Sequence, residues 1–260
     1  MGVYRLQEIK VLSPTAILGY GFPVESFQNG LAQHPDFIAV DAGSTDPGPY
    51  YLGAGVSFTD REAVKRDLKL ILKAGKELGI PVLIGSAGGS GANEHLAWNE
   101  EIVKEIAQEE NLNIKTAIIT AEIPKTEILK KYEEGKIKPL PPAGEILRED
   151  IENTSRIVAQ MGIEPIIDAL NNDVDLVLAG RAFDPTVFAA PCIKAGFPQG
   201  LALHMGKILE CASIAATPGS GSDCMLGTLR HDCFILEALN PNRRCTVTSI
   251  AAHTLYEKNN

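Results

Sequence analysis

Short apolar runs rich in β-branched residues alternate with helix-like stretches along much of this chain. Five such runs are typical of strands, and they lie at residues 9–12, 37–40, 81–84, 116–119 and 174–178. Between the second and third runs, apolar residues recur at helical spacing from Val64 to Leu78, and Gly79 then ends the predicted helix. This alternation predicts an α/β protein with a mostly parallel sheet, either open and Rossmann-like or closed and barrel-like.

The later part of the chain has longer helix-like stretches and then a change of pattern. We expect helices over residues 150–170, 184–195 and 201–216. From Thr217 on, Gly/Ser-rich loops and short strands follow, so we predict an α/β core domain over 1–216 and the start of a C-terminal extension or subdomain over 217–260. Because the sequence stops inside a helix-like stretch at 255–260, we expect it to be a piece of a longer chain.

Composition and charge narrow the class of protein. With 260 residues, 45% hydrophobic and 22% charged, the chain can close a core without disulfides, which excludes a disordered or fibrous protein. The 24 Lys and Arg against 33 Asp and Glu give a net charge of −9, which argues against a nucleic-acid partner. No signal peptide or membrane-spanning run is visible, and five cysteines without zinc-site spacing fit a reducing cytoplasm.

The candidate chemistry lies in four loops that follow predicted strands. They comprise residues 13–16, 41–51, 85–91 and 180–185, and all are rich in small or functional side chains. Ligands of α/β sheets and barrels gather at the carboxyl ends of the strands, where such loops converge. We therefore expect Asp41, Ser86 and Arg181 to face one common pocket.

The glycine-rich loop 85–91 precedes a predicted helix that begins near Asn93. Bare N–H groups and the helix dipole at such a position favour an anion. The candidate anion-binding residues are Ser86, Gly88, Gly89, Ser90 and Gly91. Neither a Walker A loop nor the dinucleotide pattern GxGxxG is present. The alternative interpretation is a tight turn with close helix packing.

Loop 41–51 concentrates carboxylates, hydroxyls and prolines beyond what a connection needs. Asp41 ends an apolar strand, a usual place for a general base or metal ligand, and an Asx-turn or N-cap is its alternative role. Ser44 is a further candidate for substrate binding. Asp41 and Asp46 are weak candidates for ligands of a divalent cation, and turn chemistry is the simpler role for Asp46.

Arg181 follows a predicted strand directly. Its planar guanidinium suits a substrate carboxylate or phosphate, and an internal salt bridge to Asp184 is the alternative. Asp184 itself is most simply a helix N-cap with Pro185 in the first helical position.

Three reactive side chains share one face of the predicted helix 201–216. His204, Lys207 and Cys211 stand at i, i+3 and i+7, and they are candidates for proton transfer, charge stabilisation and thiolate chemistry. The alternative is a solvated face in which Lys207 pairs with Glu210. In the small-residue loop that follows, two serines are candidates for the same site, Ser220 and Ser222.

Several segments of the chain together resemble one known family. They are VLSPTAILGYGFP, VDAGSTDPGPYYLG, IGSAGGSGA, IVAQMGIEP, AGRAFDP and LALHMGKILECASIAATPGSGSDCMLGTL. Spread over nearly the whole chain, they are similar to the acyclic terpene utilisation protein AtuA family. The resemblance implies a context in the catabolism of terpenoid or branched acids and related small carboxylates. It also implies a small ferredoxin-like partner protein, and it carries over no catalytic residue.

Two hypotheses about function remain. The leading one is a metabolic enzyme in which loop 85–91 and Arg181 hold a small carboxylate or acyl-CoA. Asp41 and His204 would then move protons in a hydration, elimination or isomerisation, with CoA or a divalent cation as candidate cofactors. The alternative is a non-catalytic or ligand-binding subunit that needs a small partner protein to complete its site. We also expect a homo-oligomer.

Overall fold

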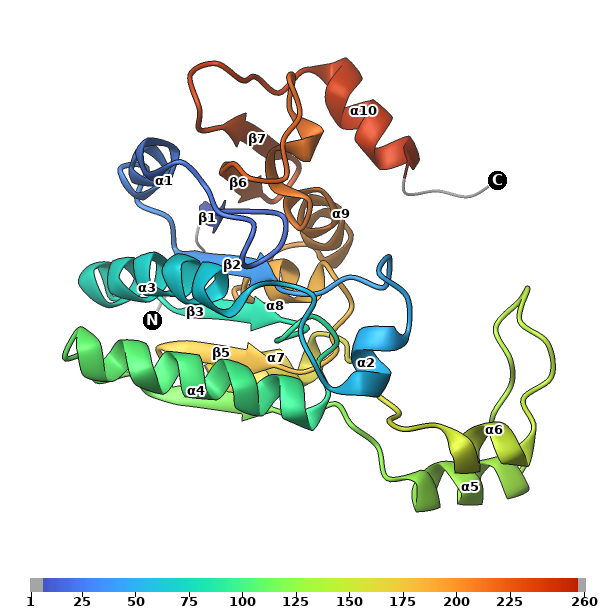
Figure 1. The fold of residues 1–260 in the computed structure, drawn as a ribbon. Helices are drawn as coiled ribbons and strands as arrows, with labels where there is room; N and C mark the ends of the chain where they lie inside the picture. The colour runs from blue at the N-terminus through green and yellow to red at the C-terminus, as the bar shows by residue number, and fades with distance from the viewer. Residues whose placement is uncertain (1–6, 257–260) are drawn as a thin grey trace, which may run out of the picture.

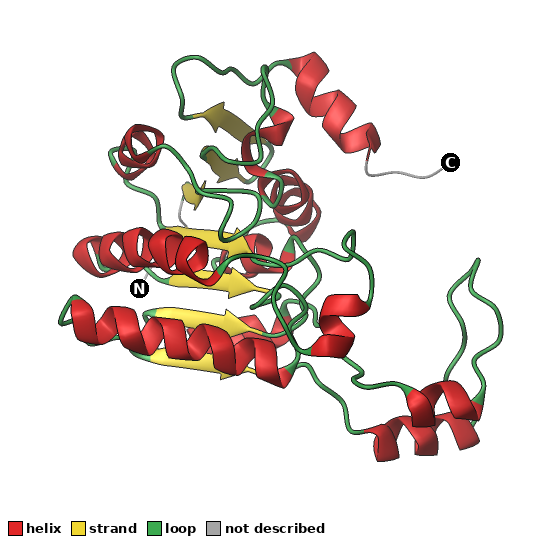
Figure 2. Cartoon of the chain, viewed as in Figure 1, coloured by secondary structure: helices red, strands yellow, loops and turns green. Residues whose placement is uncertain are grey.

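In the computed structural model, which describes residues 7–256, helices cover both faces of one sheet (Figures 1 and 2). Within these residues the strand order is β4-β5-β3-β2-β1-β6-β7. The strands are β1 (Glu8–Ser13), β2 (Phe37–Asp41), β3 (Val82–Gly85), β4 (Thr116–Ile119), β5 (Leu176–Ala179), β6 (Met225–Arg230) and β7 (Phe234–Ala238). The first five pair in parallel, and β6 and β7 are antiparallel. The predicted α/β class is confirmed, and the sheet is open with edges at β4 and β7.

The central strands are buried on both faces, which explains why they appear in the sequence as continuous apolar runs. On β2, Phe37 and Ala39 pack into one layer of the core, whereas Ile38 and Val40 pack into the other. All five residues of this strand are buried. The five predicted strands are all present, within two residues of their expected bounds.

Three helices cover each face of the parallel part of the sheet (Figure 1). One layer contains α1 (Val24–Leu31), α3 (Arg61–Leu78) and α4 (Asn93–Glu109), and the other contains α7 (Glu164–Leu170), α8 (Thr186–Lys194) and α9 (Gln199–Leu209). Helix α3 follows its sequence signals closely. The Asp60 carboxylate caps it by accepting from the N–H of Ala63, and Gly79 ends it in the left-handed conformation.

Two of the predicted helices are wrong in extent. The helix expected over 150–170 is two short helices, α6 (Arg148–Asn153) and α7, because the chain between them runs extended and forms bridges with other segments. Pro165, which a helix accepts in its first turn but not its interior, lies at the start of α7. The helix expected over 201–216 ends at Leu209, and a 3-10 turn, η1 (Ala212–Ala215), follows, with its first residue Ala212 in the left-handed region.

An arm formed by α5 (Lys125–Glu133), α6 and their connection projects from the body (Figures 1 and 2). Of residues 122–157, Ile151 is the one that is buried. The arm leaves and re-enters the body at one place, where the N–H of Ile123 donates to the carbonyl of Ile157 at 2.9 Å and Glu122 bridges Val158. Its helices therefore pack mainly against each other.

The short strands expected after Thr217 are β6 and β7. Strand β6 pairs with β1 along its whole length, so this region extends the sheet of the α/β core, and the predicted boundary at 216/217 stays a prediction. Helix α10 (Val247–Tyr256) follows, and the short helix α2 (Tyr50–Ala54) lies within the loop after β2. No helix in residues 7–256 combines the length and the apolar character needed to cross a bilayer.

Candidate functional site

The loops after β2, β3 and β5 meet at the carboxyl edge of the sheet. Strands β3 and β5 are neighbours, yet α4 follows β3 on one face and α8 follows β5 on the other. Such a point opens a crevice between the two loops, and ligands of doubly wound sheets bind there. The loops are in backbone contact, because the N–H of Arg181 donates to the carbonyl of Gly91 at 3.2 Å. A Cβ at Gly91 would lie 2.1 Å from the Arg181 nitrogen, so this approach requires glycine.

Most of the backbone N–H groups in the glycine-rich loop after β3 form hydrogen bonds within the protein. Four of its N–H groups donate to backbone carbonyls, those of Ser86, Ala87, Gly89 and Gly91. The Ser86 side chain is buried, with its hydroxyl 3.3 Å from the backbone nitrogen and oxygen of Ala182. A Cβ at Gly88 would strike His95. The loop thus has the close packing of the alternative interpretation, and among its candidates Ser90 lines the cleft described next.

The cleft at this edge consists of two adjoining hollows that share Ser44, Thr45, Gln160 and Arg181. The polar hollow has a volume of about 550 Å³. Its further lining includes Asp41, Asp46, Asp184, Lys207, Glu210 and Cys211, with Tyr20, Ile214 and Tyr256 among the apolar side chains. The apolar hollow has a volume of about 460 Å³ and adds Gly48, Pro49, Leu52, Ser90 and Val158. Both volumes are in the range of small-molecule sites.

Asp41 ends β2 and is only 2% exposed within the wall of the polar hollow. Its Oδ1 accepts from the N–H of Gly43 at 3.2 Å, which is the Asx-turn that the sequence offered as an alternative. Burial raises the pKa of the Asp41 carboxyl well above its ordinary value, and the charges of Asp184 and Glu210 raise it further. Arg181 and the Gly43 N–H act in the opposite direction. Asp41 therefore keeps its proton to a higher pH than an ordinary aspartate.

Arg181 lies where the two hollows join. Its side chain is 9% exposed, and within the described residues its ion pair is a long one, 3.5 Å from Nη2 to Oδ1 of Asp184. The internal salt bridge that the sequence offered as an alternative is thus present. A guanidinium has five N–H donors, and one distant carboxylate uses few of them. Arg181 can consequently bind an anionic ligand without first breaking a close pair.

Lys207 connects two carboxyls on the wall of the polar hollow. Its Nζ lies 3.0 Å from Asp184 Oδ2 and 2.8 Å from Glu210 Oε1. Asp184 was expected to cap a helix, and this is wrong, because α8 begins at Thr186 and the Asp184 carboxylate binds Lys207 instead. The pair of Lys207 with Glu210, which the sequence offered as the alternative role of Lys207, is present, although it lines a hollow rather than a solvated face.

The pKa values of Lys207 and Glu210 depend on burial as well as on the ion pair between them. Burial disfavours the Lys207 ammonium, but the hydrogen bonds to Glu210 and Asp184 outweigh it and raise the Lys207 pKa. For Glu210 burial outweighs the bond to Lys207, so the Glu210 pKa is raised as well. The Cys211 thiol donates to Glu210 Oε1 at 3.3 Å.

The remaining candidates lie outside the cleft. His204 Nε2 is 3.5 Å from the Thr254 hydroxyl of α10, and its ring packs edge-on to Phe234 at 5.1 Å. Cys211 lines the polar hollow beside Lys207, whereas His204, two turns earlier, contacts α10 and β7 instead. Ser220 and Ser222 bond to each other in the loop beside β1 and line neither hollow.

Asp184 and Glu210 are the functional side chains that sequence reasoning undervalued. Both entered as structural partners, a cap and a surface ion pair. A signal for Glu210 was present, since it follows Ile208 and Leu209 and precedes a run of small residues, which indicates burial. Gln160 was missed because the stretch that contains it was predicted as a helix.

Asp41 and Asp46, the weak candidates for metal ligands, do not belong to a cluster of ligands within the described residues. Across residues 7–256, no group of three or more His, Cys, Asp or Glu side chains is placed to hold an ion. Asp46 instead takes part in a turn, where its N–H donates to the Ser44 hydroxyl at 3.1 Å. The carboxyls of the cleft face Arg181 and Lys207.

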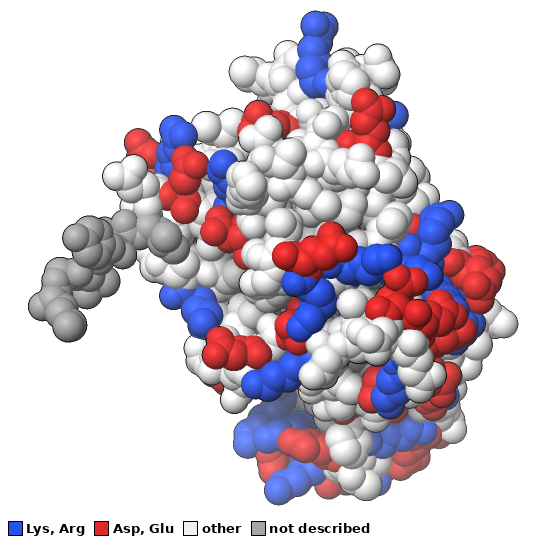
Figure 3. All heavy atoms as spheres, turned by 90° about the vertical axis from the view of Figure 1, so that its left-hand side faces the viewer, with Lys and Arg blue, Asp and Glu red and all other residues white. Residues whose placement is uncertain are grey.

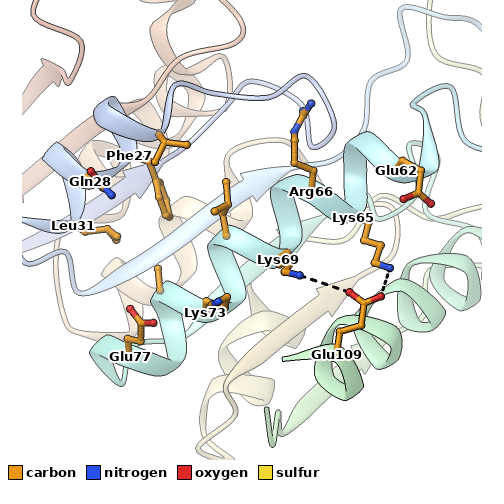
Figure 4. A pocket seen from close by; sticks show the side chains of 13 residues that line it. Phe27, Gln28, Leu31, Glu62, Lys65, Arg66, Lys69, Lys73, Glu77 and Glu109 are labelled. Atoms are coloured by element: carbon orange, nitrogen blue, oxygen red, sulfur yellow. Dashed lines mark hydrogen bonds and ion pairs between the residues drawn. The ribbon is translucent and has the colours of Figure 1, made fainter. Parts of the chain in front are cut away.

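A different hollow, of about 520 Å³, lies between α1 and α3 (Figure 4). Phe27 and Leu31 contribute apolar surface to it, and Lys65 and Lys69 reach across to Glu109 of α4. Glu110 pairs with Lys69 and with Lys73, whose Nζ lies 2.6 Å from Glu110 Oε2. We call this row of ion pairs, from Lys65, Lys69 and Lys73 of α3 to Glu109 and Glu110, the ladder. Acidic and basic side chains are likewise interspersed on the face at the amino ends of the strands (Figure 3). These charges neutralise one another.

An open, mostly parallel sheet with helices on both faces and a polar cleft at its carboxyl edge defines a doubly wound α/β protein. The profile of the family described as acyclic terpene utilisation family protein AtuA matches residues 61–223, which is well over half of the chain. The chain therefore belongs to this family, as its motifs indicated, and the family's description supplies a context of acyclic terpene utilisation. Neither the curated proteins nor the solved structures yielded a match to the chain.

Proposed function

We propose that this chain is a metabolic enzyme that transfers a proton on a small carboxylate or acyl-CoA, in the catabolism of terpenoid or branched acids. The observation that carries the proposal is the buried Asp41 carboxyl, with its raised pKa, beside Arg181 in one cleft. Buried carboxyls with shifted pKa values concentrate at catalytic sites. The family context agrees with such a substrate.

The residues of the cleft have separate roles in this proposal. Arg181 binds the carboxylate or carbonyl oxygen, and Asp41 exchanges a proton with a nearby carbon. Lys207 stays charged between Asp184 and Glu210 and stabilises negative charge that develops on the substrate. Hydration, elimination and isomerisation all need one group that can give and take a proton, and Asp41 is that group. We place the reaction in the cytoplasm, where the thiols of the five cysteines stay reduced.

Deuterium exchange tests the proton transfer without knowledge of the final product. The chain is incubated in D₂O with 3-methylbut-2-enoate or its CoA thioester, and proton NMR follows loss of the C2 and C4 hydrogens. We expect exchange with the unaltered chain and a loss of 10²-fold or more in Asp41→Asn. The rate should rise with pH as Asp41 ionises, because the carboxylate form removes the first proton from carbon and the acid formed returns a deuteron.

The Lys73→Met variant, altered on the α3 surface away from the cleft, is the matched control and should exchange normally. Thermal unfolding of Asp41→Asn should remain cooperative, which separates lost chemistry from lost structure. Exchange at an unchanged rate in Asp41→Asn would remove Asp41 from the reaction. Absence of both exchange and ligand-induced stabilisation with every acid and thioester would refute the enzyme proposal.

A second candidate function is a ligand-binding subunit whose site a small partner protein closes. The observation that favours it is the apolar rim of the polar hollow, where Tyr20 and Ile214 are 49% and 47% exposed and Tyr256 is 83% exposed. Exposed apolar side chains around a polar site mark surfaces that bind another protein. Under this function the chain alone shows no exchange, and addition of a small ferredoxin-like protein restores ligand-induced stabilisation.

A further inference from the structure

The charges that line the cleft favour one class of anion over another. Two cations line its two hollows, Arg181 and Lys207, against the four carboxyls of Asp41, Asp46, Asp184 and Glu210. Lys207 already contacts Asp184 and Glu210 at 3.0 and 2.8 Å. Even with Asp41 protonated, the lining carries one more negative than positive charge. It therefore offers one cationic position to a ligand, that of Arg181.

The surroundings of Arg181 differ on its two sides. On one side the polar hollow contains Asp41 and the Lys207 group. On the other side Pro49, Leu52 and Val158 line the apolar hollow, where Arg181 is the one charged side chain that residues 7–256 contribute. A ligand held by Arg181 can thus extend an uncharged chain in one direction only without placing it against carboxyls.

We propose, building on the function proposed above, that the ligand is a free monocarboxylic acid with an apolar chain and not a CoA thioester. Its carboxylate binds the Arg181 guanidinium where the two hollows join, and its chain occupies the apolar hollow. A thioester has lost the carboxylate that would pair with Arg181. It also carries several phosphate charges into a cleft that is already negative, where like charges repel.

Calorimetric titration of the unaltered chain with five ligands tests the inference directly. The ligands are acetate, isovalerate, octanoate and isovaleryl-CoA, with isovaleramide as the uncharged analogue of isovalerate. We expect affinity to rise about threefold to fourfold for each added methylene until the hollow is full. Isovaleramide and isovaleryl-CoA should bind at least tenfold more weakly than isovalerate.

Two variants locate the parts of the ligand. Arg181→Met should reduce the affinity for all acids at least thirtyfold, a usual cost for losing one partner of a buried charge pair. Leu52→Asn should leave acetate binding unchanged and remove most of the gain from acetate to octanoate. The Lys73→Met variant is the control and should bind every ligand as the unaltered chain does.

The outcomes separate this inference from the function on which it rests. If isovaleryl-CoA binds as tightly as isovalerate and its binding depends on Arg181, the free-acid inference is overturned and the site stands. An affinity that does not change with chain length would overturn the assignment of the apolar hollow. If no acid, amide or thioester binds, the proposed function fails together with it.

Discussion

Two groups of lysines and carboxyls in this protein have the same chemistry and opposite electrostatics. On the ladder between α3 and α4, Glu110 pairs with Lys69 and Lys73, and these bonds lower its pKa to about 2. In the cleft, Glu210 pairs with Lys207, yet its pKa is raised. The surface Glu110 carboxylate has two lysines and a lowered pKa. The buried Glu210 carboxyl shares one lysine with Asp184 and has a raised pKa.

The difference shows that an ion pair does not by itself indicate which way a carboxyl titrates. Where solvent is near, pairing dominates, and the carboxylate holds its charge. Where solvent is excluded, the cost of burying charge is larger than the gain from one shared lysine. Asp41 is the extreme case, since it is 2% exposed and is flanked by two other carboxyls. The carboxyls of Asp41 and Glu210 in the cleft therefore keep their protons to a higher pH than usual, whereas Glu110 on the ladder loses its proton at a lower pH.

The largest effect on stability should come from Lys207→Met. This change leaves Glu210 without its cation and leaves Asp184 with the long 3.5 Å contact to Arg181, and we expect it to lower the free energy of unfolding by about 2 kcal/mol at pH 8. The loss should shrink at pH 5, because the raised pKa of Glu210 favours a protonated carboxyl there. Urea denaturation at the two pH values measures both. Lys73→Met, the matched change on the ladder, should shift the midpoint little, and equal losses in the two variants would contradict the comparison.

Asp41→Asn should change how stability depends on pH. Because the Asp41 pKa is raised on folding, the folded state holds a proton that the unfolded state releases, and stability falls as pH rises from the unfolded toward the folded pKa. The slope contributed by one such group is up to about 1.4 kcal/mol per pH unit. The asparagine variant should lose that part of the slope in urea titrations between pH 4 and 9.

The matched control for this experiment is Asp46→Asn, on the same loop, where the aspartate is exposed. It should leave the slope as it is in the unaltered chain. A slope that persists in Asp41→Asn would show that the Asp41 carboxyl is ionised in the folded protein, and the contrast with the ladder would then rest on Glu210 alone.

The smallest effect is expected on the ladder itself. Carbon-13 NMR of the side-chain carboxyls should show Glu110 titrating near pH 2 at low salt. Its contribution to stability is then present above the unfolded pKa and is lost as pH falls through the folded one. In 1 M NaCl the midpoint should return toward 4.5, because salt screens surface pairs, whereas the buried Asp41 should respond much less. A salt response of equal size at both sites would remove the distinction.

The sequence predicted those parts of the molecule that depend on local pattern. The five parallel strands are recognisable because each is a short apolar run, and Asp41 and Arg181 were found because each directly follows one. The open form of the sheet was not decided by the pattern, since it depends on which strands become neighbours. The helix over 150–170 failed because apolar spacing continues through a stretch that tertiary bridges hold extended.

The composition of the cleft was harder to predict than its position. Lys207 and Cys211 line it while His204 does not, because His204 lies against Phe234 of β7 and Thr254 of α10. These contacts come from segments that are distant in the sequence. Burial also decides the titration of Asp41 and Glu210, and burial is a property of the assembled layers.

The arm that carries α5 and α6 joins the body through one pair of adjacent backbone segments, at Glu122 and Val158. A two-residue turn could close the gap that the arm spans, because the ends already meet. Deletion of the arm should leave the sheet unchanged, because β4 and β5 pair with each other and β5 pairs with β3, and none of these pairings involves the arm. The fold thus contains a position at which chain length is almost free to vary, a natural place to insert a tag, a linker or a foreign domain.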